Sequence, residues 1–320
     1  YDQDSDQGAL LEELQRNLRL ISVVVCLAVL VLFGAFSTFL SRRVRTLLGG
    51  IRTVRAGEYT HRISMDGHDE LAQLAEEFNQ LTGRLQVTEE ERRRFVSDAS
   101  HELKTPLASI RLLTDSILQD ASIDRDTARE FVADIGEAAD RLIHISQELL
   151  ELNRLDEGRD MAQEPVDWTE QVEKIGRMLA PLAEEDRITL ETDLGEDCIV
   201  RCNQEDASQI LRNLMENAIK YNVTGGEVLV TTRRQGAQVL LSVADTGVGI
   251  PEADMPRIFE RFYRVDKARS RAAGGTGLGL SIVRDAVRHH GGTITVQARQ
   301  PAGVVFTVIL PAWREEESGG

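Results

Sequence analysis

The sequence predicts a multi-domain chain with one membrane-spanning helix, a series of packed helices and a C-terminal α/β domain. Three observations lead to this fold class. Residues 20–40 contain no charged side chain. Apolar residues then recur at alternating steps of three and four in two stretches, 71–85 and 131–152, which is the spacing of helices that pack along a seam. After about residue 158, segments with strand and helix patterns alternate.

Composition excludes several classes of protein. The 320 residues suffice for two or three domains, and a hydrophobic content of 42% can form real cores. A formal net charge of −16 argues against a nucleic-acid partner, which a basic face would normally bind. Cys198 and Cys202 have no histidine or further cysteine near them in sequence. We therefore interpret both as reduced core residues, without a metal or a disulfide.

Residues 20–40 are expected to cross a membrane, because about 20 apolar residues in a helix span the hydrocarbon core. A buried soluble helix or a signal peptide is the alternative. Acidic residues precede the run and three arginines follow it within five residues, which is not the charge order of a signal peptide. The arginines predict that residues 1–19 are an extracytoplasmic stub and that residues after 40 are cytoplasmic. Because the chain starts at Tyr1 and not at methionine, we expect further sensor sequence upstream.

Residues 41–90 contain two helical series joined by a connector. The first series ends at Gly57, and Asp69 is a good N-cap for the second helix. The apolar residues of the second series are Leu71, Leu74, Phe78, Leu81 and Leu85. Their heptad spacing is typical of a parallel bundle across a dimer axis, so we predict a small helical domain here.

Residues 91–157 are expected to form a helical hairpin with a polar break at 119–126. Its apolar positions are Phe95, Ala99, Leu103, Ile110, Leu113 and Ile117 on the first arm, and Phe131, Ile135, Ala138, Leu142, Ile145, Leu149 and Leu152 on the second. Each arm has one seam, and a second copy of the hairpin would bury both seams best. We therefore predict a homodimer held by an all-α four-helix bundle.

The first arm carries a candidate nucleophile, His101. On a helix His101 and Thr105 share a face, and Glu102 lies beside them. Pro106 cannot donate to the helix ladder, so we expect the helix to be disturbed there. A solvated His–Glu pair is the ordinary alternative. His144, on the second arm, has no comparable surroundings and is interpreted as structural.

Residues 158–313 are predicted to form one α/β domain, followed by a polar tail at 314–320. Strands are expected at 188–192, 199–202, 227–233, 239–244, 293–298 and 304–310, and helices at 169–184, 205–221 and 278–289. The second of these helices places Asn213, Asn217 and Lys220 on one side. Amide oxygens suit a hard cation and a lysine suits phosphate, although a solvated polar face is the ordinary alternative.

Two glycine-containing segments follow that helix. Residues 245–249 read Asp-Thr-Gly-Val-Gly after an apolar strand, where glycine lets a backbone approach a ligand. Residues 274–280 read Gly-Gly-Thr-Gly-Leu-Gly-Leu and open a helix, where free amide groups favour a phosphate. The Walker lysine and the second acid of a dinucleotide fold are both missing. The aromatic segment 259–264 and the small, charged segment 269–273 are interpreted as a mobile lid.

Together these segments resemble the transmembrane sensor histidine kinases of two-component systems. The N, G1, F and G2 boxes of their ATP-binding domain, which DNA gyrase shares, look like residues 213–221, 245–249, 259–263 and 275–279. The surroundings of His101 are similar to the histidine box, and residues 41–90 resemble a HAMP domain. The resemblance implies a Bergerat (GHKL-like) α/β sandwich for residues 158–313.

The resemblance also implies ATP and Mg²⁺ as cofactors. Asp245 would bond to the adenine amino group, Asn217 and Asn213 would hold the metal ion, and Lys220 would contact phosphate. The other ATP-binding residues that it implies are Tyr221, Gly247, Gly249, Phe259, Gly275, Thr276, Gly277, Leu278 and Gly279.

The implied reaction is autophosphorylation of His101, with Glu102 orienting the ring or accepting its other proton. The phosphoryl group would pass to an aspartate of a response regulator. Thr105 matches a residue that positions water when related kinases dephosphorylate that partner. The implied location is the bacterial cytoplasmic (inner) membrane, with the kinase domains in the cytoplasm.

Three positions depart from the family patterns. Thr46 replaces a usual HAMP proline, Lys104 replaces a usual arginine, and Asn213 stands where gyrase-like enzymes carry a water-activating glutamate. The amide of Asn213 suits an enzyme whose nucleophile is a side chain. The alternatives are a non-catalytic signalling scaffold with a retained ATP fold and an ATP-driven clamp; the intact His101 disfavours the first and Asn213 the second.

Overall fold

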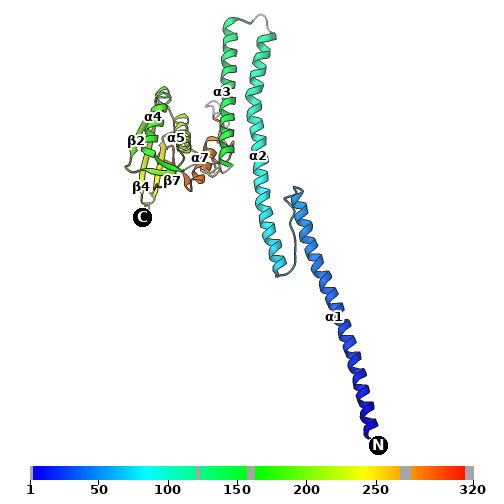
Figure 1. Cartoon of the computed structure of the whole chain (residues 1–320). Helices are drawn as coiled ribbons and strands as arrows, with labels where there is room; N and C mark the ends of the chain where they lie inside the picture. The colour runs from blue at the N-terminus through cyan, green and yellow to red at the C-terminus, as the bar shows by residue number, and fades with distance from the viewer. Residues whose placement is uncertain (1–2, 120–122, 157–162, 267–274, 314–320) are drawn as a thin grey trace. The chain divides into compact units, whose positions relative to one another are not determined.

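The computed structural model describes residues 3–119, 123–156, 163–266 and 275–313 (Figure 1). The chain divides into two compact units, Tyr1–Arg94 and Phe95–Gly320. The predicted domain boundary at 157–158, the predicted lid segment at 269–273 and the polar tail lie outside the described residues.

Helix α1, Gln3–Arg55, joins the apolar run and the first helix of the HAMP-like region without a break. It is the one helix in the described part of the chain that is long and apolar enough to cross a membrane. Its large apolar side chains are exposed, with Phe33 at 69% and Leu30 at 66%. So long an apolar surface without protein cover is what a helix in lipid presents.

The connector between α1 and α2, Glu70–Gln119, packs on both helices. A small core of Leu47, Ile63 and Ala75 forms there. The Asn79 side chain accepts from the Ile63 N–H at 2.8 Å and donates to the Ile63 carbonyl at 2.9 Å. Asp69 accepts from the Ala72 N–H at 3.0 Å, which confirms the predicted N-cap.

A helical hairpin is formed by the part of α2 from Phe95 onward and by α3, Arg125–Asp156. Glu102 of α2 and Arg141 of α3 pair at 3.2 Å. Helix α2 continues through Pro106, so the expected disturbance does not end the helix. Proline has no backbone N–H, but this removes only one of the many hydrogen bonds that hold the long helix.

The α/β domain contains the remaining elements. In chain order these helices and strands are β1 Glu164–Asp167, α4 Trp168–Glu185, β2 Thr189–Leu194, β3 Ile199–Cys202, α5 Gln204–Lys220, β4 Glu227–Gln235, β5 Gln238–Asp245, α7 Gly279–His289, β6 Thr293–Ala298 and β7 Val304–Pro311. A mixed five-stranded sheet has the order β2-β4-β5-β7-β6, with β2 and β4 parallel and the other pairs antiparallel. The predicted α/β class is confirmed.

Strand β1 was not predicted, because its four residues include a proline and show no useful alternation. It pairs antiparallel with β3. In β4, β5 and β7 every second residue is buried, which is the pattern of a sheet with one covered face. Helices α4, α5 and α7 pack against the sheet and share one core with it.

Cys198 and Cys202 are both buried, which confirms their predicted core positions. Burial raises the pKa of the Cys202 thiol to about 12. The neutral thiol therefore prevails at physiological pH, as expected for a packing residue.

Candidate active site

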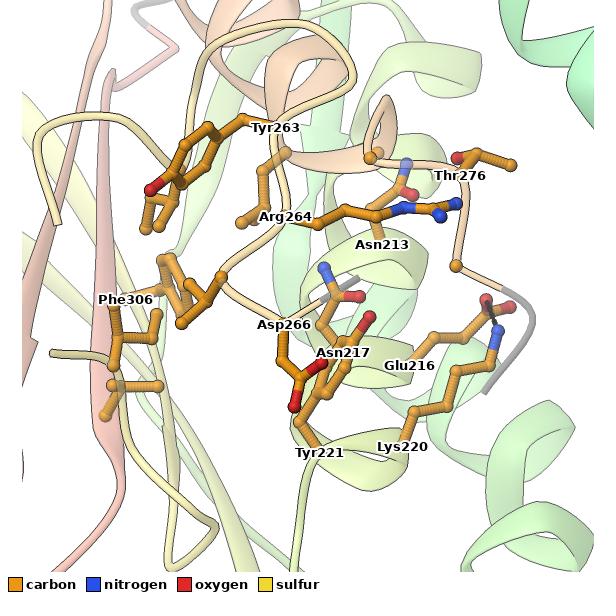
Figure 2. A pocket seen from close by; sticks show the side chains of 18 of the residues that line it. Asn213, Glu216, Asn217, Lys220, Tyr221, Tyr263, Arg264, Asp266, Thr276 and Phe306 are labelled. Carbon is orange, nitrogen blue, oxygen red and sulfur yellow. Dashed lines mark hydrogen bonds and ion pairs between the residues drawn. The ribbon is translucent and has the colours of Figure 1, made fainter. Parts of the chain in front are cut away.

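A cavity of about 360 Å³ lies in the α/β domain between α5, the segment after β5 and the loop that opens α7 (Figure 2). Ten of the predicted ATP-binding residues line it: Asn213, Asn217, Lys220, Tyr221, Asp245, Gly249, Gly275, Thr276, Gly277 and Gly279. The fold thus brings together four segments that are far apart in the sequence.

Three other predicted residues are not among those that line the cavity. Gly247 donates its N–H to Asp245 Oδ1 at 2.8 Å. Phe259 packs edge to face on Phe306, with ring centroids 6.5 Å apart. Leu278 is fully buried. In this structure they support the walls of the cavity and do not face it.

Helix α5 has one apolar face and one face toward the cavity. Leu211 and Leu214 are buried in the core, whereas Asn213 and Asn217 point into the cavity (Figure 2). The Asn213 amide donates to the Gln209 carbonyl at 3.0 Å, which leaves its oxygen for a ligand. A Cβ on Gly279 would lie 2.6 Å from that oxygen, so only glycine leaves it free.

Asp245 ends strand β5 and is only 5% exposed. Its Oδ1 accepts from the N–H groups of Gly247 at 2.8 Å and Val304 at 3.4 Å. Burial raises the pKa of Asp245, and these two bonds oppose that rise without cancelling it. Oδ2 accepts no hydrogen bond within the described residues, so it can accept one from a ligand amino group. Beside it Ile250, Val304 and Phe306 provide apolar lining suited to a flat ring.

The lining of the cavity also includes five acidic, basic or imidazole side chains that were not predicted from the sequence to be site residues: His144, Glu148, Glu216, Arg264 and Asp266. Glu216 pairs with Lys220 at 3.5 Å (Figure 2). His144 and Glu148 belong to α3, so the hairpin completes one wall of the cavity. The position of His144 in this wall was not predicted from the sequence. Helical periodicity could not predict this wall position, because periodicity shows which face of a helix is buried and not which domain covers that face.

An apolar cluster joins the hairpin to the α/β domain. Leu152 of α3 packs with Leu278 and Ile282, all nearly or fully buried. Phe95 of α2 stacks at a tilt on Phe262, with ring centroids 5.9 Å apart. Contact with the hairpin therefore contributes to the burial of Leu278.

A charged network lies beside this cluster. Arg154 of α3 pairs with Asp206 of α5, and Asp206 Oδ2 lies 2.7 Å from His290 Nε2. Burial raises the pKa of Asp206, but the hydrogen bonds from His290 and Arg154 outweigh it, and the net pKa is lowered. Sequence patterns carried no signal for this network, since its members are far apart along the chain.

Replacing Asp206 with Asn is expected to lower the free energy of unfolding by about 1.5 to 3 kcal/mol, the range for a charged hydrogen bond. Because the pKa of Asp206 is lowered on folding, its contribution is complete above the ordinary aspartate pKa of about 4 and is lost as pH falls through the lowered value. Denaturant unfolding of the full chain in detergent micelles at several pH values measures this. Asp193→Asn, at a side chain that is 60% exposed, is the control. A wild-type advantage that grows toward acid would contradict the expectation.

His101 is exposed on α2 and does not line the cavity. Its neighbour Glu102 lies 3.2 Å from Arg141 and 3.6 Å from Arg264, and Arg264 lines the cavity. The Thr105 hydroxyl donates to the His101 carbonyl at 3.2 Å. The predicted phosphoacceptor is therefore one residue away from a carboxylate that contacts the cavity wall.

The oxygen donors of the cavity fit a hard divalent cation. In the described ranges no three His, Cys, Asp or Glu side chains cluster closely enough to hold a metal ion by themselves. The amide oxygens of Asn213 and Asn217 can supply a partial set, and Mg²⁺ commonly takes its other ligands from phosphates and water.

Known families match three parts of this chain. Residues 35–87 match the HAMP domain, residues 91–158 the His Kinase A (phospho-acceptor) domain, and residues 202–314 the histidine kinase-, DNA gyrase B- and HSP90-like ATPase. The chain belongs to the sensor histidine kinases. The resemblance seen in the sequence is thereby confirmed.

Two curated relatives illustrate the similarity to other sensor histidine kinases. BaeS of Escherichia coli is 34% identical over 299 residues, covering 92% of this chain and 63% of BaeS. SenX3 of Mycobacterium tuberculosis is 41% identical over 224 residues, covering 69% of this chain and 54% of SenX3. The chain thus spans between half and two thirds of the length of these relatives.

Solved structures of histidine kinases share the fold. ThkA in complex with the response regulator TrrA has a TM-score of 0.57 at 23% identity, covering 78% of this chain and 69% of that one. Full-length ShkA in complex with AMPPNP has a TM-score of 0.51 at 26% identity, covering 68% of this chain and 45% of that one.

Proposed function

We propose that this sensor histidine kinase transfers the γ-phosphoryl group of ATP to His101 and then to an aspartate of a response regulator. The observation that carries the proposal is the cavity in which Asp245, Asn217 and the glycine-rich loop at 275–279 meet, in one compact unit with His101. The AMPPNP bound to ShkA and the response regulator bound to ThkA support both halves of the proposal.

In this proposal one end of the cavity binds the adenine base and the other end binds the phosphates. Asp245 Oδ2 accepts from the adenine amino group while the apolar lining contacts the ring. Lys220, Thr276 and the amides of Gly277 and Gly279 bind the phosphates. Asn217 and Asn213 would hold a Mg²⁺ ion that neutralises charge on the triphosphate.

The His101 ring attacks the γ-phosphorus in line as ADP leaves, and Glu102 orients the ring or accepts its second proton. Glu102 currently contacts Arg141 and Arg264 and must exchange these partners to do so. Since His101 does not line the cavity, the α/β domain must also move relative to the hairpin before transfer.

We also propose the cellular arrangement predicted from the sequence. Residues 1–19 would lie outside the cytoplasmic membrane and residues 20–40 would cross it. Residues 41–90 would form the HAMP domain, 91–157 the phosphoacceptor domain and 158–313 the ATP-binding domain. Leu107 and Leu118 are 59% and 77% exposed on one side of α2, and a second hairpin in a four-helix homodimer would cover them.

The chemical stability of the phosphoryl product tests this function. The full chain in detergent micelles is incubated with ATP labelled on its γ-phosphate, and the protein is then treated with acid or base. A phosphohistidine is lost in acid and survives base. ATP turnover without protein label would favour the ATP-driven clamp, and absence of both would favour the non-catalytic scaffold.

Replacing Thr105 with Ala should spare autophosphorylation and slow the loss of phosphate from the partner regulator about tenfold or more, since positioning of a reactant is worth at least that much. Among the described residues the Thr105 hydroxyl bonds only to the helix backbone, so its removal should not unfold α2. Thr114→Ala, with the same type of bond to the Ile110 carbonyl, is a matched control. Equal loss of kinase and phosphatase activity would contradict this role.

A further inference from the structure

Glu148 belongs to the hairpin helix α3, yet its side chain lines the cavity of the ATP-binding domain. Only 6% of the residue is exposed. Its Oε1 lies 3.5 Å from Nε2 of His144, one turn away on the same helix. Its Oε2 is buried and has no hydrogen-bond partner among the described residues. A buried carboxylate oxygen without a partner is costly, so its position calls for an explanation.

The surroundings of Glu148 are those expected of a bound phosphate. Burial raises the pKa of the Glu148 carboxyl, and the Thr276 hydroxyl and the positive charge of Lys220 act in the opposite direction. Thr276 belongs to the glycine-rich loop and Lys220 ends α5, so both are proposed phosphate contacts. Glu216 adds a second negative charge and pairs with Lys220 (Figure 2).

We propose that Glu148 occupies the place of a nucleotide phosphate when α3 is packed against the ATP-binding domain. Nucleotide binding and the packing of α3 then compete for Thr276 and Lys220. This inference rests on the proposed function, because it takes the cavity to be the ATP site.

Charge and geometry carry the proposal. A carboxylate and a phosphate both offer anionic oxygen acceptors, and two such anions cannot share one small buried site without strong repulsion. Entry of the phosphates must therefore displace Glu148, and with it the wall of the cavity that α3 supplies. Because Leu152 lies one turn farther along α3, the displacement also strains its contact with Leu278. Loading of ATP would in this way release the hairpin for the approach of His101.

Glu148→Ala tests the competition by removing the internal anion. We expect the full chain in detergent micelles to bind Mg²⁺–ADP about tenfold more tightly, with Kd measured by calorimetry, because the interaction of two nearby partly screened charges is of that order. Binding of adenosine, which has no phosphate, should not change. Glu137→Ala removes an exposed carboxylate from the same helix and should leave both affinities unchanged.

A second measurement uses the wild-type chain, so it does not depend on the folding of a variant. Saturation with Mg²⁺–ADP should accelerate hydrogen exchange of the α3 amides between His144 and Leu152. Slower exchange there, or Mg²⁺–ADP affinity that stays equal or falls in Glu148→Ala, would overturn the inference. A fall seen only with Mg²⁺ present would identify Glu148 as a cation ligand instead.

The two proposals fail separately. If the nucleotide effects appear but labelled ATP leaves no phosphate on the protein, the kinase function fails and the competition stands. If His101 is labelled and Glu148→Ala does not tighten ADP binding, the competition alone fails.

Discussion

Replacing His101 with Gln is expected to reduce the transfer of phosphate from ATP to the protein by at least about a thousandfold, as the loss of an enzyme nucleophile usually does. The glutamine amide is close to imidazole in polarity, but its nitrogen is not nucleophilic. Because His101 is exposed and does not line the cavity, the affinity for Mg²⁺–ADP should remain unchanged. Label on the protein and Kd for ADP are the two measurements.

His68→Gln is a suitable control, since it changes an exposed histidine in the HAMP domain. It should leave both measurements unchanged. Label that persists in His101→Gln would show that another residue is the phosphoacceptor. Loss of label together with loss of ADP binding would show that the substitution damages the nucleotide site.

Replacing Asp245 with Asn is expected to weaken the binding of Mg²⁺–ADP between about tenfold and about 150-fold, the equivalent of one charged hydrogen bond. The Asn oxygen can still accept the N–H of Gly247, which places the NH₂ group where Oδ2 was. That group is a donor and would face the adenine amino group, which is also a donor. Calorimetry on the full chain gives the affinity.

The same variant should change base preference. A guanine ring presents a carbonyl oxygen where adenine has its amino group, so the preference for ADP over GDP should shrink in Asp245→Asn. Asp193→Asn, at an exposed strand end of the same domain, should behave as wild type. Unchanged affinity and unchanged base preference would mean that Asp245 does not contact the base.

Much of the fold can be predicted from local sequence patterns. The α/β class, the N-cap at Asp69 and the core positions of Cys198 and Cys202 follow from periodicity, capping and composition. Each depends on residues near one another in the chain. The predicted strand at 293–298 coincides with β6, Thr293–Ala298, because its β-branched residues lie between clear turn signals.

The parts that could not be predicted depend on contacts between distant segments. Glu148 and His144 have ordinary helical surroundings in sequence and become wall residues only because α3 packs on the ATP-binding domain. Leu278 lies inside a glycine-rich motif, where the sequence suggests ligand contact, but it is buried in a cluster that includes Leu152 of α3. Pattern analysis identifies which side chains face a core, and it does not identify the partner.

The position of Asp245 on the central strand β5 has a consequence for inhibitor binding. Strands β4 and β7 flank β5. Asp245 pairs with Val228 of β4, and its carboxylate, which we propose binds the base, accepts a hydrogen bond from the Val304 N–H of β7 at 3.4 Å. A group held in this way is already ordered before a ligand arrives, and little conformational entropy is lost when the base binds. An adenine-like fragment without phosphates would thus bind to a site that is already in its binding conformation. Its affinity should not depend on whether the hairpin is packed against the ATP-binding domain.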